Sequence, residues 1–321
     1  MTYLRAHHCL ASSGEVSTEN IRFLKQVQTA YLHRAFAKNR LSIQDLTSQI
    51  HHSINQAAAQ SGWNNFTQIP IFIGSTAYTM AHYEHSQVAN SFTLDELAQA
   101  LQRNYGYAHI NCFATSCTSA AHALAQAHFI LTNGWTERAF LVGAESHNLL
   151  TLLHFHSLGL LKSPQQPQGF ILGEGIATLA LETSAKQSGL HLIASHSHTQ
   201  ANISDHSADG IATLMQHVLA QANLSASDIA AIKLHAIGTP STDQAELAAI
   251  DAVFAQRPAL HAFKNQVGHT LGASGAIEIA AWQNVLHDFL HTQTQNQTAH
   301  FLALFLGFGG NAVAQIWKHQ P

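Results

Sequence analysis

The sequence predicts an α/β protein built from two similar halves. Short apolar runs that end in small residues alternate along the chain with longer segments of helical periodicity. Such alternation is typical of α/β proteins with largely buried sheets. A weak internal repeat divides the pattern, because a helix that starts at a small-residue turn is twice followed by a glycine-rich turn and a strand. We therefore expect two halves packed face to face, with a site at their junction.

The individual elements follow from local patterns. Strands are expected where short apolar runs end in glycine, serine or threonine. They cover residues 69–76, 138–146, 175–182, 231–239 and 300–310. Helices are expected where apolar residues recur at helical spacing. They cover residues 91–104, 117–131, 209–223, 242–256 and 272–290. Polar segments at 166–170 and 291–300 are expected to be exposed connections.

The repeat links distant segments of the chain. In the first half, SCTSAAHALAQAHFIL (116–131) precedes FILGEGIATLALE (170–182). In the second half, GHTLGASGAIEIAAWQNVL (268–286) precedes LFLGFGGNAVAQIW (304–317). We expect one domain over residues 1–321, with halves of about 1–182 and 183–321.

Composition narrows the function classes. Charged residues make up only 10% of the 321 residues, which indicates extensive burial or a large interface, and we expect an obligate oligomer. The net charge is −4 and lysine and arginine form no dense run, so a nucleic-acid partner is not expected. No apolar run approaches about 18 residues and the first residues lack a signal-peptide core, so we expect a cytoplasmic protein without membrane association.

Cysteine and histidine content bears on metal and redox chemistry. The three cysteines, Cys9, Cys112 and Cys117, have no CxxC spacing, which suits a reducing compartment better than disulfides or zinc. The 25 histidines include alternating pairs that share a strand face, but no cysteine or carboxylate nearby completes a ligand set. We expect no metal site.

Cys117 stands at an expected helix start, after the cap-type residues Thr115 and Ser116. A thiol there would feel the positive end of the helix, which lowers the thiol pKa and favours a nucleophile. The alternative is an inert core residue, because free cysteine is among the most buried residue types.

Two histidines occupy turns of small residues. His235 ends an expected strand in KLHAIGTP (233–240), and His269 precedes a glycine-flanked helix start in KNQVGHTLGASG (264–275). Ligands in α/β proteins bind at such strand ends and helix starts. We therefore expect both histidines to lie in one site with Cys117.

Taken in order, these motifs resemble those of a known family. They are Ala114-Thr115-Ser116-Cys117-Thr118-Ser119, Gly173-Glu174-Gly175, His235-Ala236-Ile237-Gly238-Thr239-Pro240, Lys264 with Gly268-His269 and Glu278, and Gly307-Phe308-Gly309-Gly310-Asn311-Ala312. From about Ile69 to Trp317 the chain resembles the β-ketoacyl-acyl-carrier-protein synthases of the thiolase superfamily, including their chain-length-factor branch. The resemblance implies a thiolase-like fold, in which two pseudo-duplicated βαβαβ halves pack as α/β/α/β/α layers.

The resemblance also implies a mechanism. Cys117 would take an acyl group from an acyl carrier protein or coenzyme A as a thioester. His235 and His269 would hydrogen-bond the carbonyl of a malonyl thioester while carboxylate leaves and the carbanion attacks the acyl group. The setting would be type II fatty-acid or polyketide biosynthesis, with a polyene-type pathway as a further case.

Further residues take roles by the same resemblance. Lys264 would belong to the catalytic group and form a buried pair with Glu278 that orients His269. The backbone N–H groups of Cys117 and Leu306 would form the oxyanion hole. Thr239 and Phe308 would bind substrate.

Cofactors and partners are implied in the same way. Decarboxylation generates the carbanion without metal or redox chemistry, so no cofactor is expected. The partners would be an acyl carrier protein and a second ketosynthase subunit, in a homodimer or a heterodimer. Candidates for a basic docking patch are Arg22, Lys25, Arg34, Lys38 and Arg40, whose alternative is an ordinary solvated face.

The chain also departs from the family pattern. It is shorter than an elongating synthase, Ile237 replaces a threonine, Ala236 replaces a glycine, and Leu306 stands where a gating phenylalanine is common. These changes concern substrate holding more than chemistry. They keep open a second hypothesis, a chain-length-factor subunit that pairs with a full-length ketosynthase and shapes its acyl pocket.

Two other readings fit less well. A degradative thiolase needs a second cysteine in the C-terminal half, and no cysteine follows Cys117. A Cys-His hydrolase would use the nucleophile and one histidine, and it leaves the second histidine motif unexplained.

Overall fold

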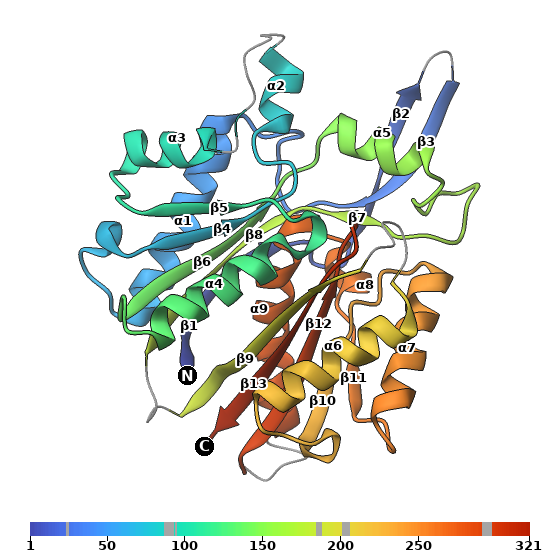
Figure 1. The fold of residues 1–321 in the computed structure, drawn as a ribbon. Coiled ribbons are helices and arrows are strands. Elements are labelled where there is room, and N and C mark those ends of the chain that lie inside the picture. Colours follow the sequence, from blue (N-terminus) through green and yellow to red (C-terminus); the bar gives the residue numbers. More distant parts are fainter. Residues whose placement is uncertain (24–25, 87–92, 94, 184–187, 201–205, 291–296) are drawn as a thin grey trace.

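The computed structural model describes residues 1–321 except 24–25, 87–92, 94, 184–187, 201–205 and 291–296. Its main sheet is formed by two five-stranded halves (Figure 1). The first contains β1 (Thr2–Ala11), β4 (Ile71–Gly74), β5 (Ile110–Phe113), β6 (Arg138–Glu145) and β8 (Gly175–Thr183). The second contains β9 (Gly189–Thr199), β10 (Ile229–Lys233), β11 (Ala259–His261), β12 (Ala299–Leu306) and β13 (Asn311–Gln320).

The two halves have the same strand order. They read β5-β4-β6-β8-β1 and β11-β10-β12-β13-β9, so the first strand of each half lies at the centre and the third at the outer edge. Pairing of Thr2 and Tyr3 with Leu192 and His191 joins β1 to β9 and makes one ten-stranded sheet. The expected duplication is therefore present, with the half-sheets joined where their first strands meet.

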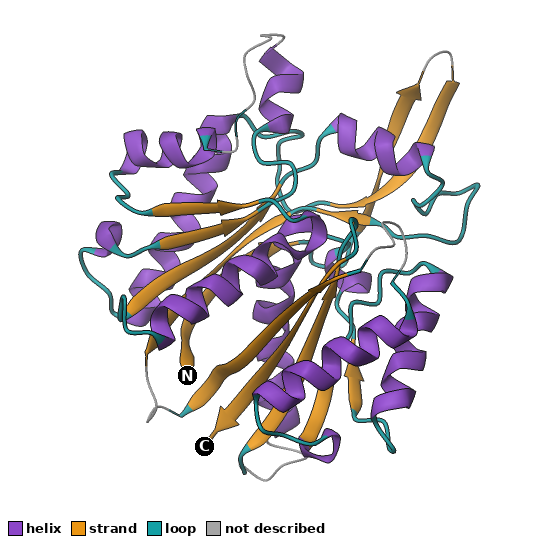
Figure 2. Ribbon diagram, viewed as in Figure 1, coloured by secondary structure: helices purple, strands orange, loops and turns teal. Residues whose placement is uncertain are grey.

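Helices complete the layers (Figure 2). The helices α4 (Ser119–Thr132) and α9 (Ser274–Phe289) pack between the half-sheets and share one hydrophobic core with both. The helices α1 (Ile43–Ser61) and α3 (Glu96–Tyr105) cover the outer face of the first half, and α6 (Ala208–Gln221) and α7 (Pro240–Val253) that of the second. These α/β/α/β/α layers confirm the predicted thiolase-like fold class.

Smaller elements surround the ends of the strands. A hairpin of β2 (Val16–Phe23) and β3 (Gln26–His33) projects from the body and pairs with β7 (Leu172–Gly173). The short helices are α2 (Met80–Ser86), α5 (Leu149–Ser157) and α8 (Lys264–Val267), with 3₁₀ turns η1 (Phe66–Gln68), η2 (Ser116–Thr118), η3 (Ala226–Asp228) and η4 (Leu271–Ala273).

Burial on both faces explains the apolar strands. In β12, Phe301, Ala303 and Phe305 join the core around α4 and α9, whereas Leu302 and Leu304 join the core under α6 and α7. A strand covered on both faces reads as a continuous apolar run. This is why the strands β4, β6, β8 and β12 were predictable from the sequence.

Glycines let the two central helices approach closely. A Cβ built on Gly74 of β4 would lie 2.2 Å from the backbone nitrogen of Ala120, and one on Gly275 of α9 would lie 2.3 Å from that of Ala121. No side chain fits at such distances. The small-residue turns of the repeat therefore serve the packing of the starts of α4 and α9 on each other and on the sheet.

Some expected boundaries were wrong. The strand expected over 231–239 ends at Lys233, because the following turn needs positive φ at Ala236 (40°) and Gly238 (95°). Of the helix expected over 91–104, the structure describes a helix from Glu96 to Tyr105, and residues 91, 92 and 94 lie outside the described residues. The sequence analysis did not predict strands β1, β2, β3, β5, β7, β9 and β11 or helices α1, α2, α5 and α8. Residues 291–296 of the second expected connection lie outside the described residues.

In the described part of the chain, no helix has the length and apolar character that crossing a bilayer requires.

Candidate active site

Cys117 and His269 meet where elements of both halves end. Cys117 lies in η2, directly after β5, and His269 lies between α8 and η4. Their Sγ and Nε2 atoms are 3.1 Å apart. His235, which follows β10, has its ring centroid 5.6 Å from that of His269. The expected convergence of these three residues is therefore observed.

Cys117 is held in a tight turn and is buried. Ser116, before it, adopts φ 57°, a conformation that costs a non-glycine residue about 1–3 kcal/mol and is common at functional turns. Burial raises the pKa of the Cys117 thiol, although the Ser116 hydroxyl, the backbone N–H of Phe308 and the charge of Lys264 work against it. The expectation of a lowered pKa was wrong, because the loss of water on burial outweighs the groups that favour the thiolate.

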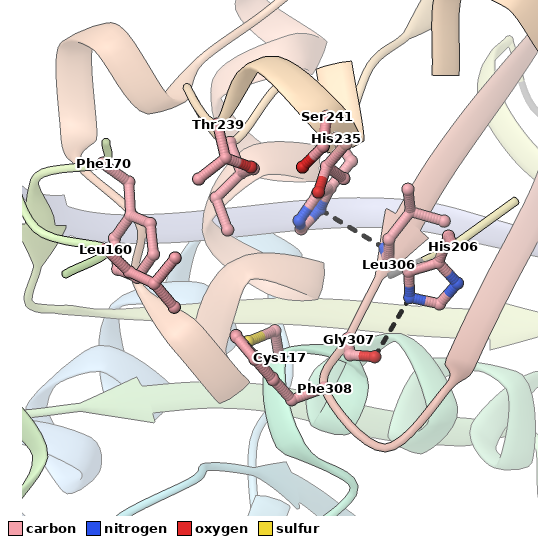
Figure 3. A pocket seen from close by; sticks show the side chains of 12 residues that line it. Cys117, Leu160, Phe170, His206, His235, Thr239, Ser241, Leu306, Gly307 and Phe308 are labelled. Atoms are coloured by element: carbon pink, nitrogen blue, oxygen red, sulfur yellow. Dashed lines mark hydrogen bonds between the residues drawn. The ribbon is translucent and has the colours of Figure 1, made fainter. Parts of the chain in front are cut away.

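Two hydrogen-bond donors face the Nδ1 atom of His235. The backbone N–H of Leu306 donates to Nδ1 over 3.3 Å (Figure 3). Nζ of Lys264 lies 3.4 Å from the same atom. Nδ1 is therefore the acceptor, which leaves the proton on Nε2. Burial, followed by the charge of Lys264, lowers the pKa of His235 well below its usual value. His235 is thus a neutral imidazole with an Nε2–H donor.

The backbone N–H of Leu306 does not point toward Cys117, as an oxyanion hole formed with Cys117 would require. Leu306 cannot serve as the second donor, because its N–H is directed at His235. The chain turns after β12 at Gly307, and the backbone N–H that reaches the Cys117 sulfur is that of Phe308. The turn therefore directs the backbone N–H of Leu306 at His235 and that of Phe308 at the Cys117 sulfur.

The buried ion pair of Lys264 and Glu278 also lies differently. Nζ of Lys264 is 2.6 Å from Glu278 Oε1 and donates to the His235 carbonyl over 2.8 Å. The expected contact was with His269, whereas Lys264 holds His235. Glu278 is fully buried and its second oxygen lies 2.5 Å from Nζ of Lys233, a residue that sequence reasoning missed.

His269 is positioned by its backbone. Its N–H donates to the Ile171 carbonyl over 2.7 Å, and its own carbonyl accepts from Gly173 over 2.9 Å. A Cβ on Gly173 would lie 2.1 Å from the Val267 carbonyl oxygen, which explains the glycine of the Gly-Glu-Gly turn. Burial lowers the pKa of His269 well below its usual value, with Lys264 contributing. Its buried Nδ1 makes no hydrogen bond within the described part of the chain.

A cavity of about 250 Å³ opens beside Cys117 (Figure 3). Thr239 and Phe308 line it as expected, and so do His235 and Ile237. Sequence reasoning missed the other lining residues, which include His206, Ser241, Thr242, Leu160 and Phe170. The signal for Ser241 and Thr242 was their place directly after the Gly-Thr-Pro turn, and nothing local marked His206, whose Nε2 donates to the Gly307 carbonyl over 3.1 Å.

The expected basic patch is largely neutralised. Arg34 pairs with Glu19 at 2.6 Å and Lys38 with Asp45 at 2.6 Å, while Arg40 lies 3.6 Å from Glu19. The side chain of Arg22 and all of Lys25 lie outside the described residues. Across the described ranges, no group of three or more histidine, cysteine, aspartate or glutamate side chains is arranged to hold a metal ion.

Known proteins resemble this chain in sequence and fold. Residues 190–298 match the family model described as β-ketoacyl synthase, C-terminal domain. A putative mitochondrial 3-oxoacyl-[acyl-carrier-protein] synthase of Schizosaccharomyces pombe is 30% identical over 222 residues, which cover 60% of this chain and 52% of that protein. The chain thus spans about half the length of the curated relatives it matches.

Solved structures share the fold over the whole chain. One is a complex of a ketosynthase (ApeO) with its chain length factor (ApeC) from Xenorhabdus doucetiae, with TM-score 0.77, 19% identity, and coverage of 99% of this chain and 98% of that chain. Another is a type II polyketide acyl-carrier protein in complex with its ketosynthase (AntDE:AntF), with TM-score 0.80, 18% identity, and coverage of 100% and 99%. The sequence match to the β-ketoacyl synthase model therefore lies in residues 190–298, and the solved ketosynthases share the fold of the whole chain.

Proposed function

We propose that this protein catalyses decarboxylative Claisen condensation of an acyl thioester, held on Cys117, with malonyl-acyl-carrier protein in type II fatty-acid or polyketide biosynthesis. The observation that carries the proposal is the 3.1 Å contact between the Cys117 sulfur and Nε2 of His269, in a cavity that His235 also lines. A nucleophile, a neutral acceptor and a second neutral imidazole are the groups that the two half-reactions need.

In the first half-reaction, Cys117 takes the acyl group. The sulfur attacks the thioester carbonyl, its proton passes to Nε2 of His269, and the carrier leaves as a thiol that takes this proton. Because burial favours the neutral thiol and the neutral imidazole, proton transfer and attack are coupled. The tetrahedral oxyanion is held by the backbone N–H groups of Cys117 and Phe308.

In the second half-reaction, a malonyl thioester enters the emptied cavity. Its C–CO₂ bond breaks, carbon dioxide leaves, and the electron pair moves toward the thioester oxygen, which accepts from Nε2–H of His235. The carbanion then attacks the acyl carbonyl, the C–S bond to Cys117 breaks, and the departing Cys117 thiolate takes up one proton from solvent. Lys264 and Glu278 position His235 and take no part as reactants. The hydroxyl of Thr239 and the ring of Phe308 line the substrate path.

The partners proposed are an acyl carrier protein and a second ketosynthase subunit, as a homodimer or a heterodimer. The complexes named above, of a ketosynthase with its chain length factor and of a ketosynthase with an acyl-carrier protein, support this assembly. The proposed compartment is the cytoplasm.

A second candidate is a chain-length-factor subunit of such a heterodimer. The changes at Ile237 and Leu306 and the likeness to a complex that contains a chain length factor favour it. In that role the protein would shape the acyl pocket of a full-length ketosynthase without condensing anything itself.

Intact-mass measurement after incubation with an acylated carrier protein tests the first proposal. We expect one acyl group on the wild type, none on Cys117→Ala, and acylation slowed by about 10²-fold or more in His269→Asn. No acylation of the wild type, alone or with a partner ketosynthase, would refute catalysis. A stable one-to-one complex with a full-length ketosynthase, whose activity survives Cys117→Ala in this chain, would support the second candidate.

A further inference from the structure

Lys233 is a fully buried cation close to the histidines but outside the cavity. It ends β10, two residues before His235, and its side chain lies toward the central layer, like that of Ala231 on the same strand. Burying an ammonium group costs several kcal/mol unless it is paired and hydrogen-bonded. A lysine in this apolar strand therefore needs charged or polar partners that offset the loss of water around its ammonium group.

The contacts of Lys233 join three elements. Its Nζ lies 2.5 Å from Glu278 Oε2 on α9 and donates to the Leu304 carbonyl of β12 over 2.8 Å. It also stands 3.6 Å from the ring centroid of Phe305, within the range of a cation–π contact. Leu304 and Phe305 directly precede Leu306, whose N–H donates to His235. Lys233 thus holds the end of the strand that supplies the donor to this histidine.

Glu278 is shared between two cations. Its Oε1 binds Lys264 at 2.6 Å and its Oε2 binds Lys233. Burial acts to raise the pKa of Glu278, but the charges of Lys233 and Lys264 outweigh it and hold this pKa below its usual value. Because Lys233 occupies one oxygen, Lys264 meets only the other and keeps donors for the carbonyl and Nδ1 of His235.

The buried charges around His235 balance. The carboxylate of Glu246 accepts from the backbone N–H of His235 over 2.6 Å and from that of Ala236 over 2.9 Å. Two ammonium groups therefore face two carboxylates. The titratable groups around His235, from every element packed against it, are Lys233, Lys264, Glu246, Glu278, His206 and His269.

We propose that Lys233 is a positioning residue for this site, a second buried cation that shares Glu278 with Lys264 and so fixes where Lys264 and the end of β12 stand relative to His235. Without it, the cluster carries a net negative charge and Glu278 draws Lys264 away from His235. A negative cluster favours protonation of His235 and His269. Since a protonated His269 cannot accept the proton of Cys117, this role deepens the proposed function and rests on it.

The test compares Lys233→Met, Lys233→Gln and Lys233→Arg with the wild type and with Lys318→Met, which removes the same charge from the far end of β13. Histidines are labelled at Cε1 and followed by NMR between about pH 5 and pH 8. The signals of His235 and His269 are assigned by their loss in His235→Asn and His269→Asn. We expect both to stay neutral in the wild type, Lys233→Arg and Lys318→Met. In the Met and Gln variants, at least one should gain a pKa about one unit higher or more.

Kinetics provide a second readout. In the Met and Gln variants we expect kcat to fall about tenfold or more with KM within about twofold, and Lys233→Arg to recover part of the loss. Unchanged histidine titrations and unchanged kcat in folded neutral variants would overturn the proposal. The titrations need no substrate, so they report on Lys233 even if the wild type proves unable to condense.

A further measurement covers the case in which neither neutral variant folds. Burial lowers the pKa of Lys233 to about 8, with Glu278 opposing the shift. In the wild type, the His235 signal should therefore move near this pH as Lys233 loses its proton. Lys233→Arg, which does not titrate there, should abolish the movement. Persistence of the movement in the arginine variant would overturn the proposal.

Discussion

Sγ of Cys117 lies 3.1 Å from Nε2 of His269, although 152 residues separate them in the sequence. Burial raises the pKa of the thiol and lowers that of the imidazole, so neither group is charged at rest. The pair differs in this respect from a preformed thiolate–imidazolium pair. Under the proposed function, the reactivity of this pair depends on the arrival of a thioester that makes proton transfer favourable.

The resting state of this pair predicts the pH dependence of Cys117 alkylation. The thiolate is the reactive form, and a raised pKa keeps it scarce near neutrality. The rate of modification by iodoacetamide should therefore rise about tenfold per pH unit from pH 7 toward pH 9. Intact-mass kinetics measure this rate, and Cys117→Ala reports the background from the exposed Cys9 and from Cys112, whose pKa burial raises to about 11. A rate already at its plateau at pH 7 would contradict the prediction.

Glu145 should make stability depend on pH. Its buried carboxylate accepts from the backbone N–H groups of Thr76, Ala77 and Gly272 over 2.8, 3.0 and 3.1 Å, yet burial raises its pKa to about 7. The folded state therefore holds this proton more tightly than the unfolded state. The stabilisation is fully present below the unfolded pKa, near 4.5, and is lost as pH rises through 7.

Urea unfolding at several pH values tests the role of Glu145. Relative to Glu145→Gln, the free energy of unfolding of the wild type should fall by about 3 kcal/mol between pH 5 and pH 8. The exposed Glu137→Gln serves as the control and should follow the wild type. Parallel curves for the wild type and Glu145→Gln would show that Glu145 does not titrate in this range.

Gly275 should tolerate no side chain. A Cβ there would lie 2.3 Å from the backbone nitrogen of Ala121, so α9 would have to move away from α4. We expect Gly275→Ala to lower the free energy of unfolding by about 1–3 kcal/mol and to slow acylation, because α4 follows Cys117 directly. Chemical denaturation measures the first effect, with the exposed Gln126→Ala on α4 as control. An unchanged midpoint would show that the helices adjust at no cost.

Ile237 should weaken the hold on substrate rather than the chemistry. It lines the cavity with Thr239, and its side chain offers no hydrogen bond to a pantetheine arm. We expect Ile237→Thr to lower KM for a carrier-linked thioester about two- to tenfold with kcat nearly unchanged, the effect of one added hydrogen bond. Steady-state kinetics of the wild type and of Ile237→Thr measure KM and kcat. A lower kcat with unchanged KM would place Ile237 in the chemical step.

Local sequence patterns were sufficient to predict the strands and helices that are buried on both faces. The strands β6, β8 and β12 and the helices α4 and α9 follow from apolar runs, helical spacing and small-residue turns in the sequence. The polar histidines in β1 and β9 hid those strands, because their apolar pattern depends on which face the rest of the chain covers. The end of β10 was misplaced because a positive φ at an alanine has no local signal.

The sequence by itself determined the fold class and the duplication and named Cys117, His235 and His269 as site candidates, because glycine-rich turns and apolar periodicity are local properties. Only the tertiary structure decided which groups meet: Lys264 with His235, Phe308 rather than Leu306 at the sulfur, and Lys233 on Glu278. It also decided the ionisation of Cys117, since loss of water depends on what the two halves of the chain bring around the thiol, and no local pattern records that.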